Sequence, residues 1–143
     1  MKIRFIKTDE RAQAPKYGTE FSAGADICAL DEVTLSPGQT VLIHTGIAVE
    51  IPDGYAGFIY ARSGMATKRG LAPANKVGVI DSDYRGEIMV AMYNQSSENR
   101  TVMAGERVAQ MVIAPYIKAE FDECETLDET LRGSGGFGST GRS

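Results

Sequence analysis

The clearest regularity along the chain is an alternation of apolar and polar positions between residues 41 and 51. All the odd positions of this stretch are apolar except Thr45, whereas the even positions include His44 and Glu50. Successive side chains of a β-strand point to opposite faces of a sheet. The stretch is therefore predicted to be a strand whose odd positions line a core. Shorter runs rich in Val, Ile, Met and Tyr predict further strands at residues 2–7, 55–61, 86–95 and 107–116.

Turn-forming residues separate these predicted strands. They occur at Ser36-Pro37-Gly38, Pro52-Asp53-Gly54 and Ala104-Gly105-Glu106. Pro presets φ at about −65° and Gly tolerates positive φ, so these residues favour tight reversals. Residues 63–69 form the best helical candidate, and it is short. Many short strands without alternating helices favour a β-sandwich or a jelly roll over a doubly wound α/β sheet.

Length and composition are those of one globular domain. The chain has 143 residues, of which 43% are hydrophobic and 24% charged, values typical of a chain that buries a core. With 15 Lys and Arg against 19 Asp and Glu, the net charge is −4. No overall basic excess therefore exists to bind a nucleic-acid backbone. A polyphosphate ligand would need a locally basic pocket.

The composition also excludes several classes of site. Two cysteines, Cys28 and Cys124, cannot form a disulfide framework or a cysteine-rich metal site, and neither is assigned a role. The lone His44 excludes multi-histidine metal sites and leaves a Ser-His-Asp triad dependent on one residue. No apolar run approaches about 20 residues, and the charged start lacks a signal-peptide core. We therefore expect no membrane segment and a cytoplasmic location with reduced thiols.

The tail is rich in glycine and serine after an acidic stretch. Residues 132–141 read RGSGGFGSTG. They match parts of the dinucleotide fingerprint and of the P-loop, but the strand–turn–helix context of the first and the lysine of the second are missing. Glycine still lets backbone N–H groups approach phosphates closely, and Arg132, Ser139 and Thr140 add donors. Phe137 can stack on a base. The tail is thus either a frayed terminus or a mobile arm that orders over a nucleotide.

Four other segments contain polar residues suited to nucleotide chemistry. They are residues 23–27, 61–66, 75–87 and 105–111. The first places the carboxylate of Asp26 after small residues, and the second places Arg62 before the short helix, where an N-terminus beside an arginine attracts anions. The third is a predicted strand that leads into an acidic turn with Asp81. The fourth places Gln110 on the face of apolar neighbours.

Each of these residues also has a purely structural explanation. Asp26 can be a turn or cap residue, Arg62 a member of an ion pair, and Gln110 a satisfied buried amide. Asp81 can belong to a solvated turn, and Tyr84 can pack in the core or at its rim. None of the segments is decisive alone. Their combination in this order changes the interpretation.

The five segments together resemble the five ordered motifs of the homotrimeric dUTPase family, over the stretch Ala23–Gly141. The third segment, Gly78–Glu87, and the fifth, Arg132–Gly141, are the most specific. The resemblance implies an all-β fold, a distorted jelly-roll β-barrel or sandwich with one short helix and a C-terminal glycine-rich arm. It also implies a core of residues 1–116 and, within the same single domain, an extension and active-site arm of residues 117–143.

The resemblance implies an enzyme that hydrolyses dUTP to dUMP and pyrophosphate, by attack of water on the α-phosphorus with Mg²⁺ as cofactor. This reaction would limit uracil in DNA and supply dUMP for thymidylate synthesis. Asp81 would activate or orient the water and hold the sugar 3′-OH, as suits a carboxylate within hydrogen-bond reach. His44 needs no role in this chemistry. Asp83 and Arg85 are expected to brace the turn.

The same resemblance implies how the nucleoside is recognised. Tyr84 would pack beneath the deoxyribose and leave no room for a 2′-OH. Asn75 and the backbone of Val77, Gly78 and Ile80 would read the uracil edge. Such a pocket would exclude the 5-methyl group of thymine and leave the cytosine amine unpaired. Both effects discriminate better than a merely apolar pocket does.

The remaining motifs would hold the triphosphate. Ser63, Gly64 and Gln110 would bind the α- and β-phosphates, with Arg62 near them. Asp26 would face Mg²⁺ through its waters, because Mg²⁺ keeps several waters beside substrate phosphates. The arm would stack a ring on uracil and bind the γ end of the triphosphate. The arm residues in these roles are Phe137 on uracil and Arg132, Gly138, Ser139 and Thr140 on the phosphate.

Members of this family combine three chains in each active site: motifs one, two and four from one subunit, motif three from a second, and the arm from a third. The resemblance therefore implies a homotrimer with three sites, and no nucleic-acid or membrane partner. Two alternatives stay open. One is a dCTP deaminase or a bifunctional deaminase-dUTPase on the same scaffold, for which we would not expect this arm. The other is a non-catalytic nucleotide-binding regulator that kept the pocket.

Overall fold

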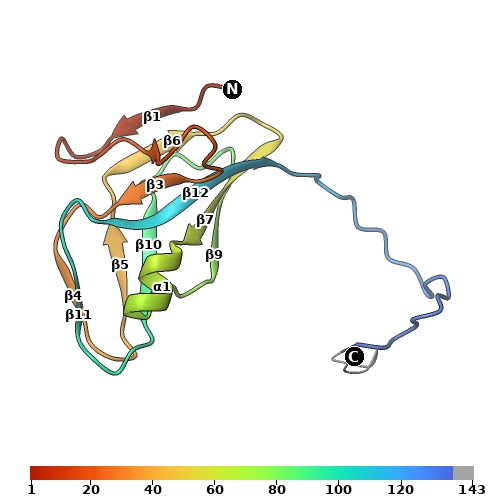
Figure 1. Cartoon of the computed structure of the whole chain (residues 1–143). Helices are drawn as coiled ribbons and strands as arrows, with labels where there is room; N and C mark the ends of the chain where they lie inside the picture. The colour runs from red at the N-terminus through yellow and green to blue at the C-terminus, as the bar shows by residue number, and fades with distance from the viewer. Residues whose placement is uncertain (137–143) are drawn as a thin grey trace.

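The computed structural model describes residues 1–136, and within this range it contains 12 strands and one short helix. The strands are β1 (Arg4–Lys7), β2 (Lys16–Tyr17), β3 (Ala25–Cys28), β4 (Val33–Leu35), β5 (Thr40–His44), β6 (Ile47–Glu50), β7 (Tyr55–Ala61), β8 (Leu71–Pro73), β9 (Val77–Ile80), β10 (Met89–Asn94), β11 (Arg100–Val102) and β12 (Arg107–Pro115). The helix is α1 (Ser63–Arg69). Figure 1 shows this mostly β body, with α1 following β7. The helix lies against β8. No helix in the described range is long and apolar enough to cross a membrane.

The largest sheet is antiparallel and has the strand order β2-β3-β12-β7-β9. On its core face, Met111 of β12 stands opposite Ala25 of β3 and Ile59 of β7, and all three are buried. On its outer face, the next residue of each strand forms a second row, in which Gln110 stands between Asp26 and Tyr60. The pleat therefore places apolar and polar rows on opposite sides of the same strands.

A second sheet and two short ladders complete the body. The second sheet has the order β5-β10-β8, and the ladders pair β1 with β6 and β4 with β11. The side chains that fill the core between them are almost all aliphatic. The largest fully buried ones include Ile27, Leu35, Ile43, Ile47, Leu71, Ile88, Met92, Val102 and Val108. Short antiparallel strands that close around one aliphatic core make the fold a jelly roll, so the predicted fold class is confirmed.

The stretch between residues 41 and 51 differs from its prediction as one strand. It forms β5 and β6, which pair with β10 and β1, and the chain reverses between them at Gly46, where φ is +67°. A Cβ on Gly46 would lie 2.7 Å from the Cβ of Ala12, so the reversal needs glycine for space as well as for φ. The odd positions are nevertheless the more buried set, with Ile43 and Val49 in the core. The periodicity is thus a correct guide to burial but not to strand continuity.

The other predicted elements match more closely. The strand predicted at residues 55–61 and the helix predicted at residues 63–69 have the observed bounds of β7 and α1. The strand predicted at residues 86–95 begins later, at Met89, because the preceding residues belong to a turn.

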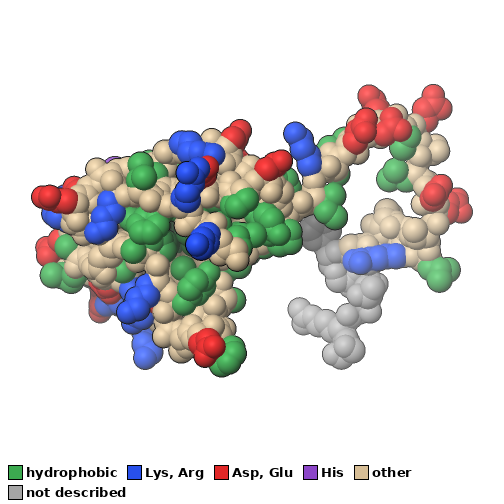
Figure 2. Space-filling model, turned by 90° about the horizontal axis from the view of Figure 1, so that it is seen from above, with side chains coloured by type: hydrophobic (Ala, Val, Ile, Leu, Met, Phe, Trp, Pro, Cys, Tyr) green, Lys and Arg blue, Asp and Glu red, His purple; other side chains and the backbone are tan. Residues whose placement is uncertain are grey.

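After β12 the chain leaves the body as an extended segment. Between residues 117 and 136 it forms no strand or helix, and Figure 1 shows it running away from the sheets. Its acidic side chains gather along it in Figure 2. Four large apolar side chains of this segment are at least 86% exposed. They are Ile117, Phe121, Leu127 and Leu131.

Candidate functional site

The first group of predicted site residues surrounds a cavity of about 590 Å³ on the outer face of the five-stranded sheet. Because Arg62 and Arg107 both line it, we call it the arginine cavity. Its wall combines residues of β3, β7 and β12 with the start of α1. The predicted site residues that it brings together are Asp26, Arg62, Ser63, Gly64 and Gln110.

Asp26 holds two arginines in the wall of the arginine cavity. Its Oδ1 accepts a hydrogen bond from Nε of Arg62 at 2.8 Å, and its Oδ2 accepts one from Nη1 of Arg107 at 3.1 Å. The carboxylate is 15% exposed, and such partial burial strengthens the attraction. Two cations and one anion leave this group with a net charge of +1. Asp26 is therefore an ion-paired strand residue and not a turn or cap residue, and the cavity keeps the local positive charge that a polyphosphate needs.

Arg107 is a candidate that the sequence analysis did not single out. It begins β12, and its partner Asp26 lies 81 residues away in the sequence. Its side chain is 57% exposed, so the guanidinium can contact a phosphate as well as Asp26. The signal in the sequence is a positive charge in the same short segment as Gln110. Only the pairing of β12 with β3 shows that the charge faces the cavity.

The amide of Gln110 is held in a defined orientation. Its Nε2 donates to the backbone carbonyl of Ala61 at 2.9 Å. Its Oε1 lies against Gly24, where a Cβ would come within 2.5 Å of that oxygen. An amide NH₂ has two donors, so the second N–H is available to a ligand in the cavity. Gln110 is thus half-buried and oriented by a bond to Ala61.

The start of α1 adds small donors to the same cavity. Ser63 and Gly64 are the first two residues of the helix, and Arg62 occupies the N-cap position without a side-chain capping bond. The first backbone N–H groups of a helix have no partner inside it. A Cβ on Gly64 would meet nothing within 4 Å, so packing does not require glycine there. The open space beside Gly64 lies at the cavity wall, where a ligand can approach the backbone.

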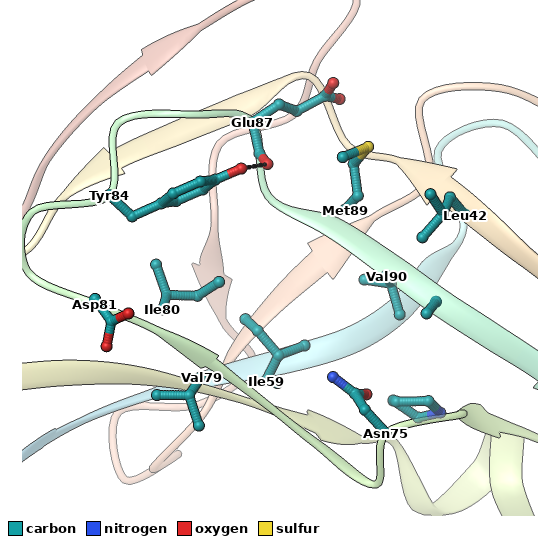
Figure 3. Close-up of a pocket in the computed structure, with 13 residues that line it drawn as sticks. Leu42, Ile59, Asn75, Val79, Ile80, Asp81, Tyr84, Glu87, Met89 and Val90 are labelled. Carbon is teal, nitrogen blue, oxygen red and sulfur yellow. Dashed lines mark hydrogen bonds between the residues drawn. The ribbon is translucent and has the colours of Figure 1, made fainter.

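The second group of predicted site residues lines a cavity of about 310 Å³, which we call the tyrosine cavity (Figure 3). β9, the turn that follows it, β10 and β7 form its wall. The predicted site residues in it are Asn75, Gly78, Ile80, Asp81 and Tyr84. Val77 does not line this cavity. It stands opposite Tyr60 of β7, at the start of β9.

The ring of Tyr84 packs against the backbone of residues 86–87. Its hydroxyl donates to the carbonyl oxygen of Glu87 at 2.9 Å, as Figure 3 shows. A Cβ on Gly86 would lie 2.4 Å from the hydroxyl oxygen and 2.6 Å from Cζ, so the ring position requires glycine there. Tyr84 is 40% exposed. It is therefore a rim residue whose position depends on the backbone of residues 86–87.

The turn between β9 and β10 is braced by its own side chains. Nη1 of Arg85 donates to the carbonyl oxygens of Ser82 at 2.6 Å and of Tyr84 at 2.9 Å. This confirms the expected bracing role for Arg85; the structure shows no comparable contact for Asp83 among the described residues. Asp81 is exposed at the edge of the tyrosine cavity (Figure 3). Its carboxylate can therefore reach a water molecule or a ligand.

Glu87 is a second residue that the sequence analysis did not assign. Its Oε1 accepts hydrogen bonds from the backbone N–H groups of Thr45 at 3.0 Å and Gly46 at 2.7 Å, and its Oε2 lies 2.9 Å from Nδ1 of His44. Burial raises the pKa of Glu87, but the hydrogen bonds from His44, Gly46 and Thr45 outweigh this and leave the pKa below its ordinary value. The carboxylate is therefore charged at neutral pH. No local pattern predicts these contacts, because they join segments about 40 residues apart.

The two cavities lie on opposite faces of one sheet. Ile59 lines the tyrosine cavity and the next residue, Tyr60, lines the arginine cavity, and successive strand residues point to opposite faces. Gly78, which stands opposite Ile59, also lines the tyrosine cavity. Gln110, which stands opposite Tyr60, lines the arginine cavity. Within a single chain, the sheet therefore stands between the two groups of predicted residues.

Among the described residues, the predicted arm residue Arg132 lines neither cavity. Arg132 is exposed in the extended segment, and its Nε donates to the carbonyl oxygen of Gly135 at 2.9 Å. The structure does not bring Arg132 to the other predicted site residues of the same chain. The remaining predicted arm residues, Phe137, Gly138, Ser139 and Thr140, lie outside the described residues.

The sequence model of the dUTPase family matches residues 10–141. The chain belongs to the dUTPase family. Among its relatives, the deoxyuridine 5′-triphosphate nucleotidohydrolase of Desulfitobacterium hafniense is 54% identical over 99% of this chain and 95% of its own length. The protein of the same name from Nautilia profundicola is 47% identical over 99% of this chain and 100% of its own length. The resemblance seen in the five segments is thus confirmed at the level of the family.

Solved structures of dUTPases share the fold of this family member. A mutant dUTPase of Staphylococcus bacteriophage 80alpha, solved with dUpNHpp, has a TM-score of 0.91 at 27% identity, and 99% of each chain is covered. A mutant dUTPase of phage phi11 of S. aureus has a TM-score of 0.81 at 26% identity, covering 88% of this chain and 98% of that chain. The phage phi11 protein coordinates a structural Mg(II) ion. The jelly roll described above is therefore the fold of these dUTPases.

The residues of this dUTPase suit a magnesium ion that arrives bound to the phosphates of a ligand. Within residues 1–136, no cluster of three or more His, Cys, Asp or Glu side chains could hold a metal alone. Asp26 accepts one arginine at each oxygen, and a carboxylate has about four acceptor sites. It can therefore also accept hydrogen bonds from metal-bound waters. Mg²⁺ commonly keeps several waters beside substrate phosphates, so this donor set fits the ion in that form.

Proposed function

We propose that this chain hydrolyses dUTP to dUMP and pyrophosphate by attack of water on the α-phosphorus. The observation that carries the proposal is the division of nucleotide chemistry between two cavities. One is cationic and offers hydroxyl and amide donors, and the other combines an exposed carboxylate with a seated tyrosine ring and an asparagine. Relatives that cover almost the whole chain carry the name of this activity.

The arginine cavity binds the triphosphate in this proposal. Arg62 and Arg107 supply charge that Asp26 only partly neutralises. Ser63, Gly64 and Gln110 supply hydrogen-bond donors to the α- and β-phosphates, with the free N–H of Gln110 already oriented by its bond to Ala61. Donors that are fixed before the reaction stabilise the developing charge without further reorganisation.

The tyrosine cavity binds the nucleoside and carries the general base. Asn75 and the backbone of Gly78 and Ile80 lie where a uracil edge can be read by hydrogen bonds, and the ring of Tyr84 supports the deoxyribose. The exposed carboxylate of Asp81 orients and deprotonates the attacking water, for which it must lie within about 3 Å of that water. Val77 contributes through its backbone at the start of β9, outside the cavity itself.

Mg²⁺ enters this proposal with the substrate. When bound, the ion neutralises phosphate charge and orients the phosphate oxygens. Asp26 would accept hydrogen bonds from the waters of the ion while keeping its two arginines in place. The chain's own contribution is therefore an outer-sphere contact to the metal, through its bound waters, together with the fixed positions of Arg62 and Arg107.

The complete site is assembled from more than one chain in this proposal. The two cavities open on opposite faces of one sheet. A nucleotide can therefore contact an arginine cavity and a tyrosine cavity together only if the tyrosine cavity of one subunit faces the arginine cavity of another. The outer face also carries partly exposed apolar side chains, among them Tyr60 at 39% exposure and the half-buried Val112. A homotrimer satisfies both observations, because a threefold axis repeats one heterologous contact three times and then closes.

The extension, residues 117–143, acts as an arm over a neighbour's site. Its exposed apolar side chains have no partner within the described part of the same chain, as expected of a segment that packs on another subunit. Arg132 and the residues Phe137, Gly138, Ser139 and Thr140 then close over the bound nucleotide, with the ring on uracil and the donors on the γ-phosphate. This leaves residues 1–116 as the core that carries the two cavities.

The function is tested by measuring pyrophosphate and ammonia from dUTP, dCTP, dTTP and UTP in parallel, with Mg²⁺. Pyrophosphate from dUTP alone, without ammonia, is the expected result. Ammonia from dCTP would instead identify a deaminase. Binding of dUTP without any product would identify a nucleotide-binding regulator and would contradict the role of Asp81.

A further inference from the structure

We propose that Glu87 is a positioning residue that fixes the ring of Tyr84 and thereby sets the preference for deoxyribose over ribose. The inference rests on the proposed function, which places the sugar against that ring. Glu87 lines the tyrosine cavity, but its carboxylate is occupied by protein groups and does not need to touch the substrate. Its effect on selectivity must therefore pass through Tyr84.

The first step is the dependence of the ring on the backbone of residues 86–87. The hydroxyl of Tyr84 donates to the carbonyl oxygen of Glu87, and the ring lies against Gly86 so closely that a Cβ would overlap it. Tyr84 is 40% exposed, so these contacts to residues 86–87 are a large part of what holds its ring. A movement of the backbone at Glu87 therefore moves the ring.

The second step is how that backbone is held. The carboxylate of Glu87 accepts the N–H groups of Thr45 and Gly46 at the reversal between β5 and β6. The neighbouring Ile88 is tied to the same reversal, because its N–H donates to the carbonyl of Ile47 at 2.8 Å and its carbonyl accepts the hydroxyl of Thr45 at 2.6 Å. Thr45 and Ile88 are buried. Residues 87–88 are thus held to this reversal by hydrogen bonds of both the side chain of Glu87 and the backbone of Ile88.

The third step links the clamp to sugar selection. A ring that excludes a 2′-OH by contact must stay in place to within a fraction of the size of that hydroxyl. Removing the carboxylate of Glu87 leaves two backbone N–H groups without their acceptor, and such groups recover hydrogen bonds by local movement or by admitting water. Either change loosens the contacts of the Tyr84 ring to residues 86–87 and makes room for the 2′-OH of ribose.

The experiment compares kcat/KM for dUTP and for UTP in the full-length protein. In Glu87→Ala the ratio of kcat/KM for dUTP to kcat/KM for UTP is expected to fall about 10-fold. The fall should come more from a higher kcat/KM for UTP than from a lower kcat/KM for dUTP. In Glu87→Gln one acceptor oxygen remains for Thr45 and Gly46, so the ratio should stay within about 3-fold of the wild-type value. Rescue by this conservative variant separates positioning from simple loss of a charge.

Glu106→Ala is a matched control for destabilisation. Glu106 also caps a turn, because its Oε2 accepts the N–H of Met103 at 3.0 Å, and it pairs with Arg69. It does not line the tyrosine cavity. This variant should lower the melting temperature as Glu87→Ala does and should leave the dUTP-to-UTP ratio unchanged.

Three results would overturn the inference. One is an unchanged ratio in Glu87→Ala protein that still unfolds cooperatively. Another is an equal fall of the ratio in Glu106→Ala. If Glu87→Ala does not fold, Tyr84→Phe removes only the hydroxyl contact to Glu87, and an unchanged ratio in that variant also contradicts the inference. A wild-type protein that does not prefer dUTP to UTP would instead reject the proposed function.

Discussion

Gly24 determines where the amide of Gln110 lies, so Gly24→Ala perturbs the phosphate-binding half of the site. A Cβ at position 24 would lie 2.5 Å from Oε1 and 3.1 Å from both Cβ and Cδ of Gln110. The amide must then move, although its Nε2 is held by the carbonyl of Ala61 at 2.9 Å. Losing that hydrogen bond lowers the free energy of unfolding by about 1 kcal/mol.

The effect on activity should be larger than the effect on stability. A displaced Gln110 no longer presents its second N–H to the phosphates, and a hydrogen bond to a charged group contributes about 1.5–3 kcal/mol. We therefore expect kcat/KM for dUTP to fall about 10- to 100-fold. Pyrophosphate release gives the rate, and chemical denaturation gives the free energy of unfolding.

Gly18→Ala is the matched control, because Gly18 lines the same cavity but its added Cβ would meet only Oγ of Ser22 at 3.7 Å. It should leave both quantities near the wild-type values. If Gly24 acts through Gln110, Gly24→Ala should have little further effect on kcat/KM in a Gln110→Ala background. Fully additive losses in the double variant, or a wild-type rate in Gly24→Ala, would refute the reasoning.

Three further predictions concern the base, the arm and the acid limit of stability. Asp81→Asn should bind dUTP with nearly unchanged affinity in calorimetry but lose turnover, since the amide cannot accept the proton of water; near-normal turnover would remove Asp81 from this role. Deletion of residues 132–143 should leave a folded trimer in sedimentation with poor catalysis, and loss of the trimer would show that the tail is structural. The pKa of Glu87 lies below its ordinary value of 4.5 in the folded protein, so its stabilising effect is complete above pH 4.5 and is lost as the pH falls through the folded pKa. Urea unfolding at a series of acid pH values should therefore show a steeper loss of stability in the wild type than in Glu87→Gln, and equal slopes would contradict this.

Local sequence signals predict the elements that have strong local causes. β7 is an apolar run after the turn Pro52-Asp53-Gly54, and α1 is the best helical candidate of the chain, so both are predicted at their observed bounds. The alternation over residues 41–51 wrongly predicts one strand, because Gly46 falls on an even position. A glycine at an even position does not interrupt the row of apolar residues at odd positions. Only the positive φ of Gly46 and its close approach to Ala12 show that the chain reverses there.

The candidate site was predictable as a set of segments but not as a geometry. The five motifs contain most of the residues that line the two cavities. The pairing of Arg107 with Asp26 and the clamp of Glu87 on the reversal at Thr45 depend on strand pairing between distant segments, which no local spacing specifies. The separation of the cavities follows from the register of β7, in which Ile59 and Tyr60 point to opposite faces.

The central claim is that an active site combines the arginine cavity of one chain with the tyrosine cavity of another. Mixing two inactive variants tests it most directly: Asp81→Asn, defective in the tyrosine cavity, and Arg62→Ala, defective in the arginine cavity. After the two are unfolded and refolded together, some mixed trimers should contain a site with both residues intact, and pyrophosphate release from dUTP should return. Each variant refolded alone should stay inactive. A mixture that remains as inactive as its parts, although mixed trimers form, would contradict the account.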